Sequence, residues 1–94
     1  MSYSLRISRD AEKEWNSLDA TIKSQFKKKL AERLEHPRIE SSRLSGMPDC
    51  YKIKLRSAGY RLVYRVFDRE VELLVVAIGK RERNNVYKAA IKRL

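Results

Sequence analysis

The sequence predicts a single α+β domain, in which an antiparallel sheet is packed by two N-terminal helices and followed by a short C-terminal helix. Hydrophobic side chains recur at helical spacing in the first third of the chain and at every second position from Cys50 onward. The expected order is therefore β-α-α-β-β-β-α, with short turns joining the last three strands into a meander that helices cover on one side. At 94 residues, the chain has the size of one domain, residues 1–94.

A short strand and a helix are expected first. Tyr3, Leu5 and Ile7 alternate with polar residues, which is typical of a strand. Ser8 can accept a hydrogen bond from a free amide at the start of a helix, which we expect over residues 9–17.

The second helix is expected over the residues that precede Pro37. Asp19 and Thr21 are candidate N-caps, and His36 should end the helix because proline forces the preceding residue out of the helical conformation. The apolar stripe of this helix consists of residues four apart: Ile22, Phe26, Leu30 and Leu34.

The second half of the chain follows the strand period. Residues 38–49 lack a clear period and contain glycine and proline, so we expect a loop there. Strands are expected over residues 50–56, 60–67 and 71–78. The last of these is almost continuously apolar, as expected of a central strand or one covered on both faces. Asn84 or Asn85 can cap a final helix, whose small apolar face is Val86, Ala89 and Ala90.

The charge of the chain points to a polyanionic partner. The chain has 22 Lys and Arg residues and 12 Asp and Glu residues, which gives a formal net charge of +10. Nucleic acid is the expected partner, because each neutralised phosphate releases condensed counterions. A membrane is not expected, since no segment is long and apolar enough to span one. Cys50 is the only cysteine, so an internal disulfide is excluded, and one cysteine with one histidine, His36, is too few for a typical zinc site. We therefore expect a cytoplasmic protein without metal or cofactor.

Cationic side chains gather on one face of the predicted meander. Lys52 and Lys54 lie two apart on a strand and share a face, and Arg56 continues the row. A hairpin loop of two or four residues would place Arg61 opposite Arg56 on that face, whereas a loop of three would turn it into the core at high cost. We expect the even loop. Because crowded like charges repel, such a cluster is tolerated mainly at functional sites.

The residue types in this cluster suit cleavage of RNA. The 2′-hydroxyl of RNA is a built-in nucleophile. A lysine crowded by cations has a lowered pKa and can act as a base, while arginines suit phosphate oxygens. Arg81 and Tyr87 follow the last strand and can add charge and stacking, whereas Glu82 is expected to pair with neighbouring arginines. This set is weak as acid–base machinery, so it would depend on a second macromolecule that positions the RNA.

The stretch Gly46–Tyr64, together with Gly79–Arg83 followed by Val86 and Tyr87, resembles the RelE family of bacterial toxins, and the similarity extends over essentially the whole chain. The resemblance implies an enzyme that needs no metal and cleaves messenger RNA in the A site of the 70S ribosome, in contact with 16S ribosomal RNA. It also implies a RelB-like antitoxin that wraps the toxin and displaces its C-terminal helix.

The resemblance implies a role for each catalytic candidate. Lys52 and Lys54 would be the base and its electrostatic support, with Arg61 stabilising the transition-state phosphate. Arg81 would assist the leaving group, and Tyr87 would stack on the substrate. How the proton roles are divided stays open.

The remaining cations are expected to bind rather than to catalyse. Candidate RNA-binding residues are Arg43, Arg56, Lys80 and Arg83. Candidate ribosome contacts, which lie off the apolar stripe of the second helix, are Lys23, Lys27, Lys28 and Arg33. The best-known member of the family is basic where this chain has Ser45, and Arg43 is the candidate substitute.

Two rival functions share parts of this pattern. A relative with the same fold could inhibit gyrase by binding, but such a relative is expected to lack the catalytic candidates, all of which are present. A nucleic-acid-binding module without chemistry would display aromatic residues on a sheet, whereas the aromatic residues here fall mostly on apolar stripes.

Overall fold

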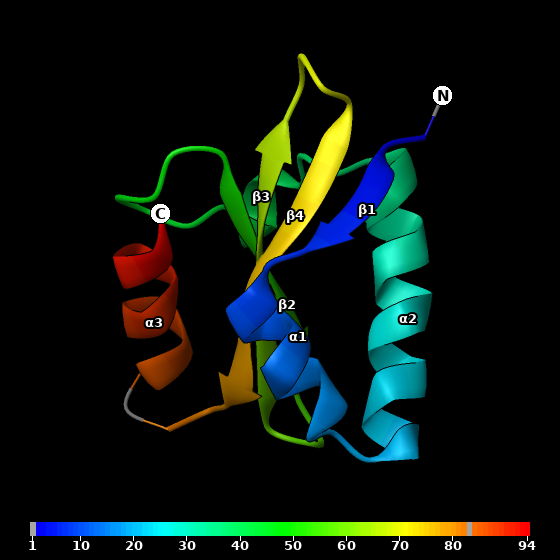
Figure 1. Ribbon diagram of the computed structural model, residues 1–94, viewed down its shortest axis with the longest axis vertical. Coiled ribbons are helices and arrows are strands. Elements are labelled where there is room, and N and C mark those ends of the chain that lie inside the picture. Colours follow the sequence, from blue (N-terminus) through cyan, green and yellow to red (C-terminus); the bar gives the residue numbers. More distant parts are fainter. Residues whose placement is uncertain (1, 83) are drawn as a thin grey trace.

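The computed structural model describes residues 2–82 and 84–94 and contains the predicted elements in the predicted order (Figure 1). They are β1 (Ser4–Ile7), α1 (Arg9–Asn16), α2 (Ala20–Glu35), β2 (Cys50–Leu55), β3 (Tyr60–Phe67), β4 (Glu72–Lys80) and α3 (Asn85–Arg93). The loop before β2 also holds one turn of 3₁₀ helix, η1 (Glu40–Ser42). In the described part of the chain, no helix has the length and hydropathy needed to cross a membrane.

The four strands form one sheet in the order β1-β4-β3-β2. The meander β2-β3-β4 is antiparallel, as predicted. The first strand pairs with β4 in parallel, from Ser4 opposite Glu72 to Ile7 opposite Val75, so the sheet is mixed at that edge. The alternation within a four-residue strand reports which side chains share a face, but it carries no information about the partner strand or its direction.

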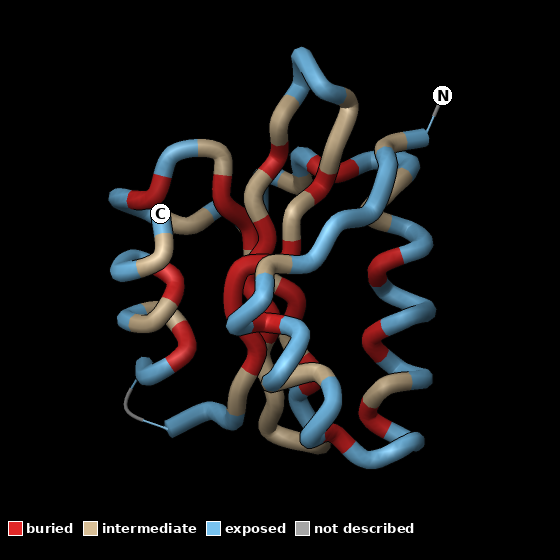
Figure 2. Tube along the Cα trace, viewed as in Figure 1, coloured by how far each residue is buried: buried red, intermediate tan, exposed pale blue. Residues whose placement is uncertain are grey.

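Helices cover both faces of the sheet, which corrects the prediction of helices on one side only (Figure 1). The face of α1 and α2 buries Ala11, Ile22, Phe26 and Leu30 from the helices and Leu18 from the segment between them. The opposite face packs against α3 through Val86 and Ala90, which contact a cluster with Val63, Val76 and Ala77. The almost continuous apolar run of β4 is explained by this arrangement, because β4 lies between two strands and is covered from both sides (Figure 2).

The helix ends are set by local hydrogen bonds. The Ser8 hydroxyl accepts from the Ala11 amide at 3.2 Å, and the Asp19 carboxylate accepts from the Ile22 amide at 2.9 Å. Asp19 is therefore the cap of α2, and Thr21 lies inside the helix. Ahead of Pro37, α2 ends at Glu35, as the sequence predicts.

A β-bulge in β4 shapes the face that α3 covers. Val63 pairs with Ala77, but the next residue, Tyr64, pairs with Val75, so Val76 is an extra residue in β4. Val76 and Ala77 consequently both belong to the cluster beneath α3.

Candidate functional site

The hairpin between β2 and β3 fixes the position of the cationic cluster. Its loop, residues 56–59, has four residues between the closing pair Leu55 and Tyr60, which confirms the predicted even register. Arg61, however, pairs with Lys54 and not with Arg56, which lies in the loop. The hydrophobic pattern excludes a shift of the strand register by one residue but not by two. The sequence therefore determined the face of the sheet on which Arg61 lies, but not the residue with which it pairs.

The cations of this hairpin lie on the face that α3 covers. Alternate residues of β2, including Ile53 and Leu55, are buried against α1 and α2. Lys52 and Lys54 therefore project to the other face, where both are half-buried. Arg61 lies directly across from Lys54 and is half-buried as well.

Arg81 is attached to the same hairpin by its backbone. Its amide donates to the Gly59 carbonyl at 2.7 Å, and Gly59 has a φ of +71°, a conformation that favours glycine. Where Arg81 meets the hairpin there is a hollow of about 280 Å³, which is lined by Lys54, Arg56, Gly59, Arg61 and Arg81. Among the described residues, no carboxylate lies within 4.0 Å of the nitrogens of these side chains or of Lys52. The hollow is thus suited to an anion.

The neighbouring positive charges affect the protonation of Lys54. The pKa of Lys54 is lowered, first by Lys52 and next by Arg61. A lowered pKa increases the neutral fraction of the amine, and the neutral amine is the form that can accept a proton. In residues 2–82 and 84–94, no group of three or more His, Cys, Asp or Glu side chains is arranged to hold a metal ion.

The final helix brings Tyr87 to this cluster. Tyr87 is half-buried beside the apolar cluster beneath α3, and burial raises the pKa of its phenol while the nearby charge of Arg61 opposes that rise. The close approach of α3 depends on Gly79, which pairs with Arg61. A Cβ at Gly79 would lie 2.9 Å from Cγ2 of Val86.

Gly79→Ala is therefore expected to displace α3 and to lower any activity that depends on Tyr87. The loss should be about tenfold, because a reacting group misplaced by an ångström or less already slows a reaction. Val86→Ala removes the methyl group in question and should restore activity in the double variant. Thermal unfolding of each variant serves as the control for folding. Equal activities of the wild type and Gly79→Ala would contradict the close-packing argument.

A second hollow adjoins the first and contains residues that sequence reasoning missed. It also has a volume of about 280 Å³ and is lined by Arg33, Ser41, Ser42, Lys52, Lys54 and Arg56. Lys54 and Arg56 line both hollows, so the two are continuous. Both serines lie in η1, within a loop that has no periodicity, and nothing in the sequence marked them.

Arg33 is half-buried, lines this hollow and makes several hydrogen bonds within the protein. It donates to the Lys52 carbonyl at 3.1 Å, to the Tyr64 hydroxyl at 2.8 Å and to the Ser42 hydroxyl at 3.3 Å. Its guanidinium also lies over the Tyr64 ring, 5.7 Å from the centroid. Arg33 thus connects α2 to β2 and η1 and helps to hold Lys52 in place. Lys23 is half-buried, and Lys27 and Lys28 are exposed.

Two further RNA-binding candidates, Arg43 and Lys80, line other hollows. Nη1 of Arg43 lies 3.5 Å from Oε1 of Glu40, and Arg43 lines a separate hollow that Ser45 also lines. Lys80 lines another, together with Glu14 and Glu82. Arg83 lies outside the described residues. Of the predicted cations, Lys52, Lys54, Arg56, Arg61 and Arg81 form one continuous cluster.

Comparisons with known proteins agree with this geometry. The family model "ParE toxin of type II toxin-antitoxin system, parDE" matches residues 5–85. The mRNA interferase toxin RelE of Escherichia coli is 57% identical over 94 residues, which cover 100% of this chain and 99% of the relative. A free double variant of E. coli RelE superposes with a TM-score of 0.93, at 55% identity over 100% of this chain and 99% of that one. The match to the intact E. coli RelBE toxin–antitoxin complex has a TM-score of 0.84 and 57% identity, and it covers 87% of this chain and 100% of that one. The chain therefore belongs to the RelE family of toxins from type II toxin–antitoxin systems.

Proposed function

We propose that this protein is the toxin of a RelE–RelB-like pair and that it cleaves messenger RNA in the A site of the ribosome. The observation that carries the proposal is the hollow around Lys54, Arg61 and Arg81, which combines several cations with no nearby carboxylate among the described residues. The 57% identity to an mRNA interferase over the full chain supports the same reaction. The site of action is the bacterial cytoplasm, where ribosomes translate.

The chemistry requires only the RNA and the side chains of the cluster. Neutral Lys54 takes the proton of the 2′-hydroxyl, whose oxygen forms a bond to the adjacent phosphorus. Arg61 neutralises the extra negative charge on the phosphoryl oxygens. The bond from phosphorus to the 5′-oxygen then breaks, and Arg81 stabilises the departing oxygen until it takes a proton from water. The products are a 2′,3′-cyclic phosphate and a 5′-hydroxyl.

Binding and orientation fall to the surrounding residues. Lys52 supports Lys54 by lowering its pKa, and Arg56 binds phosphate where the two hollows meet. Tyr87 stacks on a base and orients the codon. Correct placement of reacting groups can supply about 7–11 kcal/mol of a barrier, which explains the need for a ribosome that holds the RNA. The exposed Lys27 and Lys28, with Lys23, are proposed to contact 16S ribosomal RNA through their charge.

The proposed partner that controls the toxin is a RelB-like antitoxin. The E. coli toxin RelE forms a complex with its antitoxin, and that toxin resembles this chain along its whole length. An antitoxin that wraps this toxin would exclude it from the ribosome by bulk. If it displaces α3, it also removes Tyr87 from the cluster.

The test is cleavage of a defined message on purified ribosomes with an occupied P site and an empty A site. We expect cuts within the A-site codon, mapped by 5′ ends, and no cuts in the same RNA without ribosomes. Arg81→Ala should lower the rate by about 100-fold, since it removes charge stabilisation from the transition state. Intact messages together with inhibited DNA gyrase would overturn the proposal in favour of the gyrase-binding alternative.

A further inference from the structure

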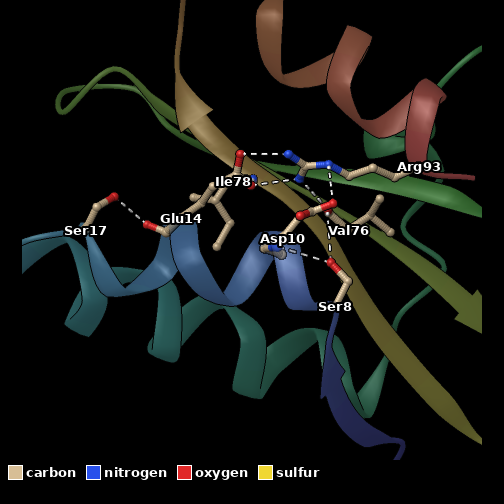
Figure 3. Close-up of polar contacts among 8 residues, drawn as sticks. Ser8, Asp10, Glu14, Ser17, Val76, Ile78 and Arg93 are labelled. Atoms are coloured by element: carbon tan, nitrogen blue, oxygen red, sulfur yellow. Dashed lines mark hydrogen bonds and ion pairs between the residues drawn. The ribbon is translucent and has the colours of Figure 1, made fainter.

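The edge of β4 is only partly covered by its neighbouring strand. Pairing with β1 stops at Ile7 opposite Val75, so the following residues of β4 lie beyond the end of β1. Side chains from α1 and α3 meet at this place instead (Figure 3). The Ile78 amide donates to Glu14 of α1 at 3.0 Å, and the Val76 carbonyl accepts from Arg93 of α3 at 2.9 Å.

Glu14 and Arg93 also form a bidentate ion pair, with two guanidinium nitrogens facing the two carboxylate oxygens. Nη1 of Arg93 lies 2.9 Å from Oε1 of Glu14, and Nη2 lies 3.1 Å from Oε2. The side chains are only 31% and 24% exposed, and Asp10 adds a weaker contact to Arg93 at 3.7 Å. A paired, partly buried geometry of this kind stabilises more than a typical surface ion pair does. We refer to the contacts of Glu14 and Arg93 with each other and with β4 as the clamp.

Apart from the clamp, α3 is attached to the sheet by the apolar packing of Val86 and Ala90, with Tyr87 and Ala89 beside them. An isolated helix of nine residues is not stable in water, so α3 depends on tertiary contacts. Only Val86 and Ala90 are buried within it. Its N-cap residue, Asn84, has a φ of +60° and makes no side-chain capping hydrogen bond. The clamp therefore adds polar contacts to this apolar packing in holding α3 to the sheet.

We propose that Glu14 and Arg93 are positioning residues for RNA cleavage, because they hold α3, and with it Tyr87, against the cationic cluster. The inference rests on the proposed function and extends it to residues on the opposite edge of β4 from the β2–β3 hairpin. Neither residue lines the hollows that contain Lys54. Arg93 bonds at the last turn of α3, whereas Tyr87 lies in its first turns, so the clamp acts through the rigid helix.

The first experiment measures hydrogen exchange of the free protein, without ribosomes. In Arg93→Gln and Glu14→Gln, we expect the amides of α3 to exchange about tenfold faster, while the amides of β2 and β3 keep their wild-type rates. Lys92→Gln is the matched control, because it removes the same charge from an exposed neighbour. Unchanged exchange in α3 of both clamp variants would overturn the proposal, and uniformly faster exchange would show a general structural role instead.

The second experiment combines each clamp variant with Tyr87→Ala in the ribosomal cleavage assay. We expect Arg93→Gln to lower kcat about tenfold in the wild-type background and to cause no further loss in Tyr87→Ala. Arg93→Lys should recover part of the rate, because an ammonium can still reach one oxygen of Glu14. A full tenfold loss in the Tyr87→Ala background would overturn the positioning role. If the wild type cleaves no message, the proposed function itself fails, and hydrogen exchange still decides whether the clamp holds α3.

Discussion

Lys54→Met is expected to lower the rate of A-site cleavage by at least about 100-fold, because a positioned general base commonly contributes 10²- to 10⁴-fold. Lys54 lies opposite Arg61 in the sheet and lines both hollows of the cluster. Methionine keeps most of the length of the side chain and removes the amine. Arg69→Met, in the exposed turn between β3 and β4, removes a charge far from the hairpin loop and should leave the rate unchanged.

The pH dependence of the same reaction separates a base from a merely electrostatic residue. A base acts when deprotonated, so cleavage should rise with pH until the pKa of Lys54 is passed. Lys52 is the largest cause that lowers this pKa. Lys52→Met should therefore raise the pKa of Lys54 and shift the rising limb of the pH–rate profile to higher pH, with the greatest loss of rate at low pH. An unshifted limb would show that Lys54 is not the titrating base.

Phe26→Ala is expected to destabilise the protein by about 3–5 kcal/mol, because it leaves a cavity in the core as well as removing buried apolar surface. Phe26 is completely buried on the inner face of α2, and its ring lies 6.4 Å from that of Trp15. Small domains are stable by only about 5–15 kcal/mol, so this loss should leave the variant marginally folded.

Denaturant unfolding, followed by circular dichroism and by the fluorescence of Trp15, measures this change. The neighbouring Gln25→Ala serves as the control, since Gln25 is exposed on the same helix and should change stability by no more than about 0.5 kcal/mol. A loss of less than about 1 kcal/mol in Phe26→Ala would mean that α2 is not held by the core described here.

Local rules were sufficient for the order of the elements and for the starts of α1 and α2, whereas β4 runs to Lys80, past the end predicted at residue 78. The periods of apolar residues predicted each helix and strand, and Ser8, Asp19 and Pro37 marked the boundaries that the structure has. They were also sufficient for the face on which Lys52, Lys54 and Arg61 lie, because alternation in a strand fixes which side chains avoid the core. The resemblance to RelE then named the catalytic candidates, and the structure gathers Lys52, Lys54, Arg61 and Arg81 in one place.

Contacts between segments far apart in the chain were decided only by the tertiary structure. They include the parallel pairing of β1 with β4, the placement of α3 on its own face, and the pairing of Lys54 with Arg61. Arg33, a candidate ribosome contact in the sequence, finds hydrogen-bond acceptors in β2 and η1 only in the folded protein. Arg93 meets Glu14 only where α1 and α3 come together at the edge of β4. A periodic pattern records which side of an element is buried. It does not record the partner, because the partner is chosen by the free energy of packing whole elements together.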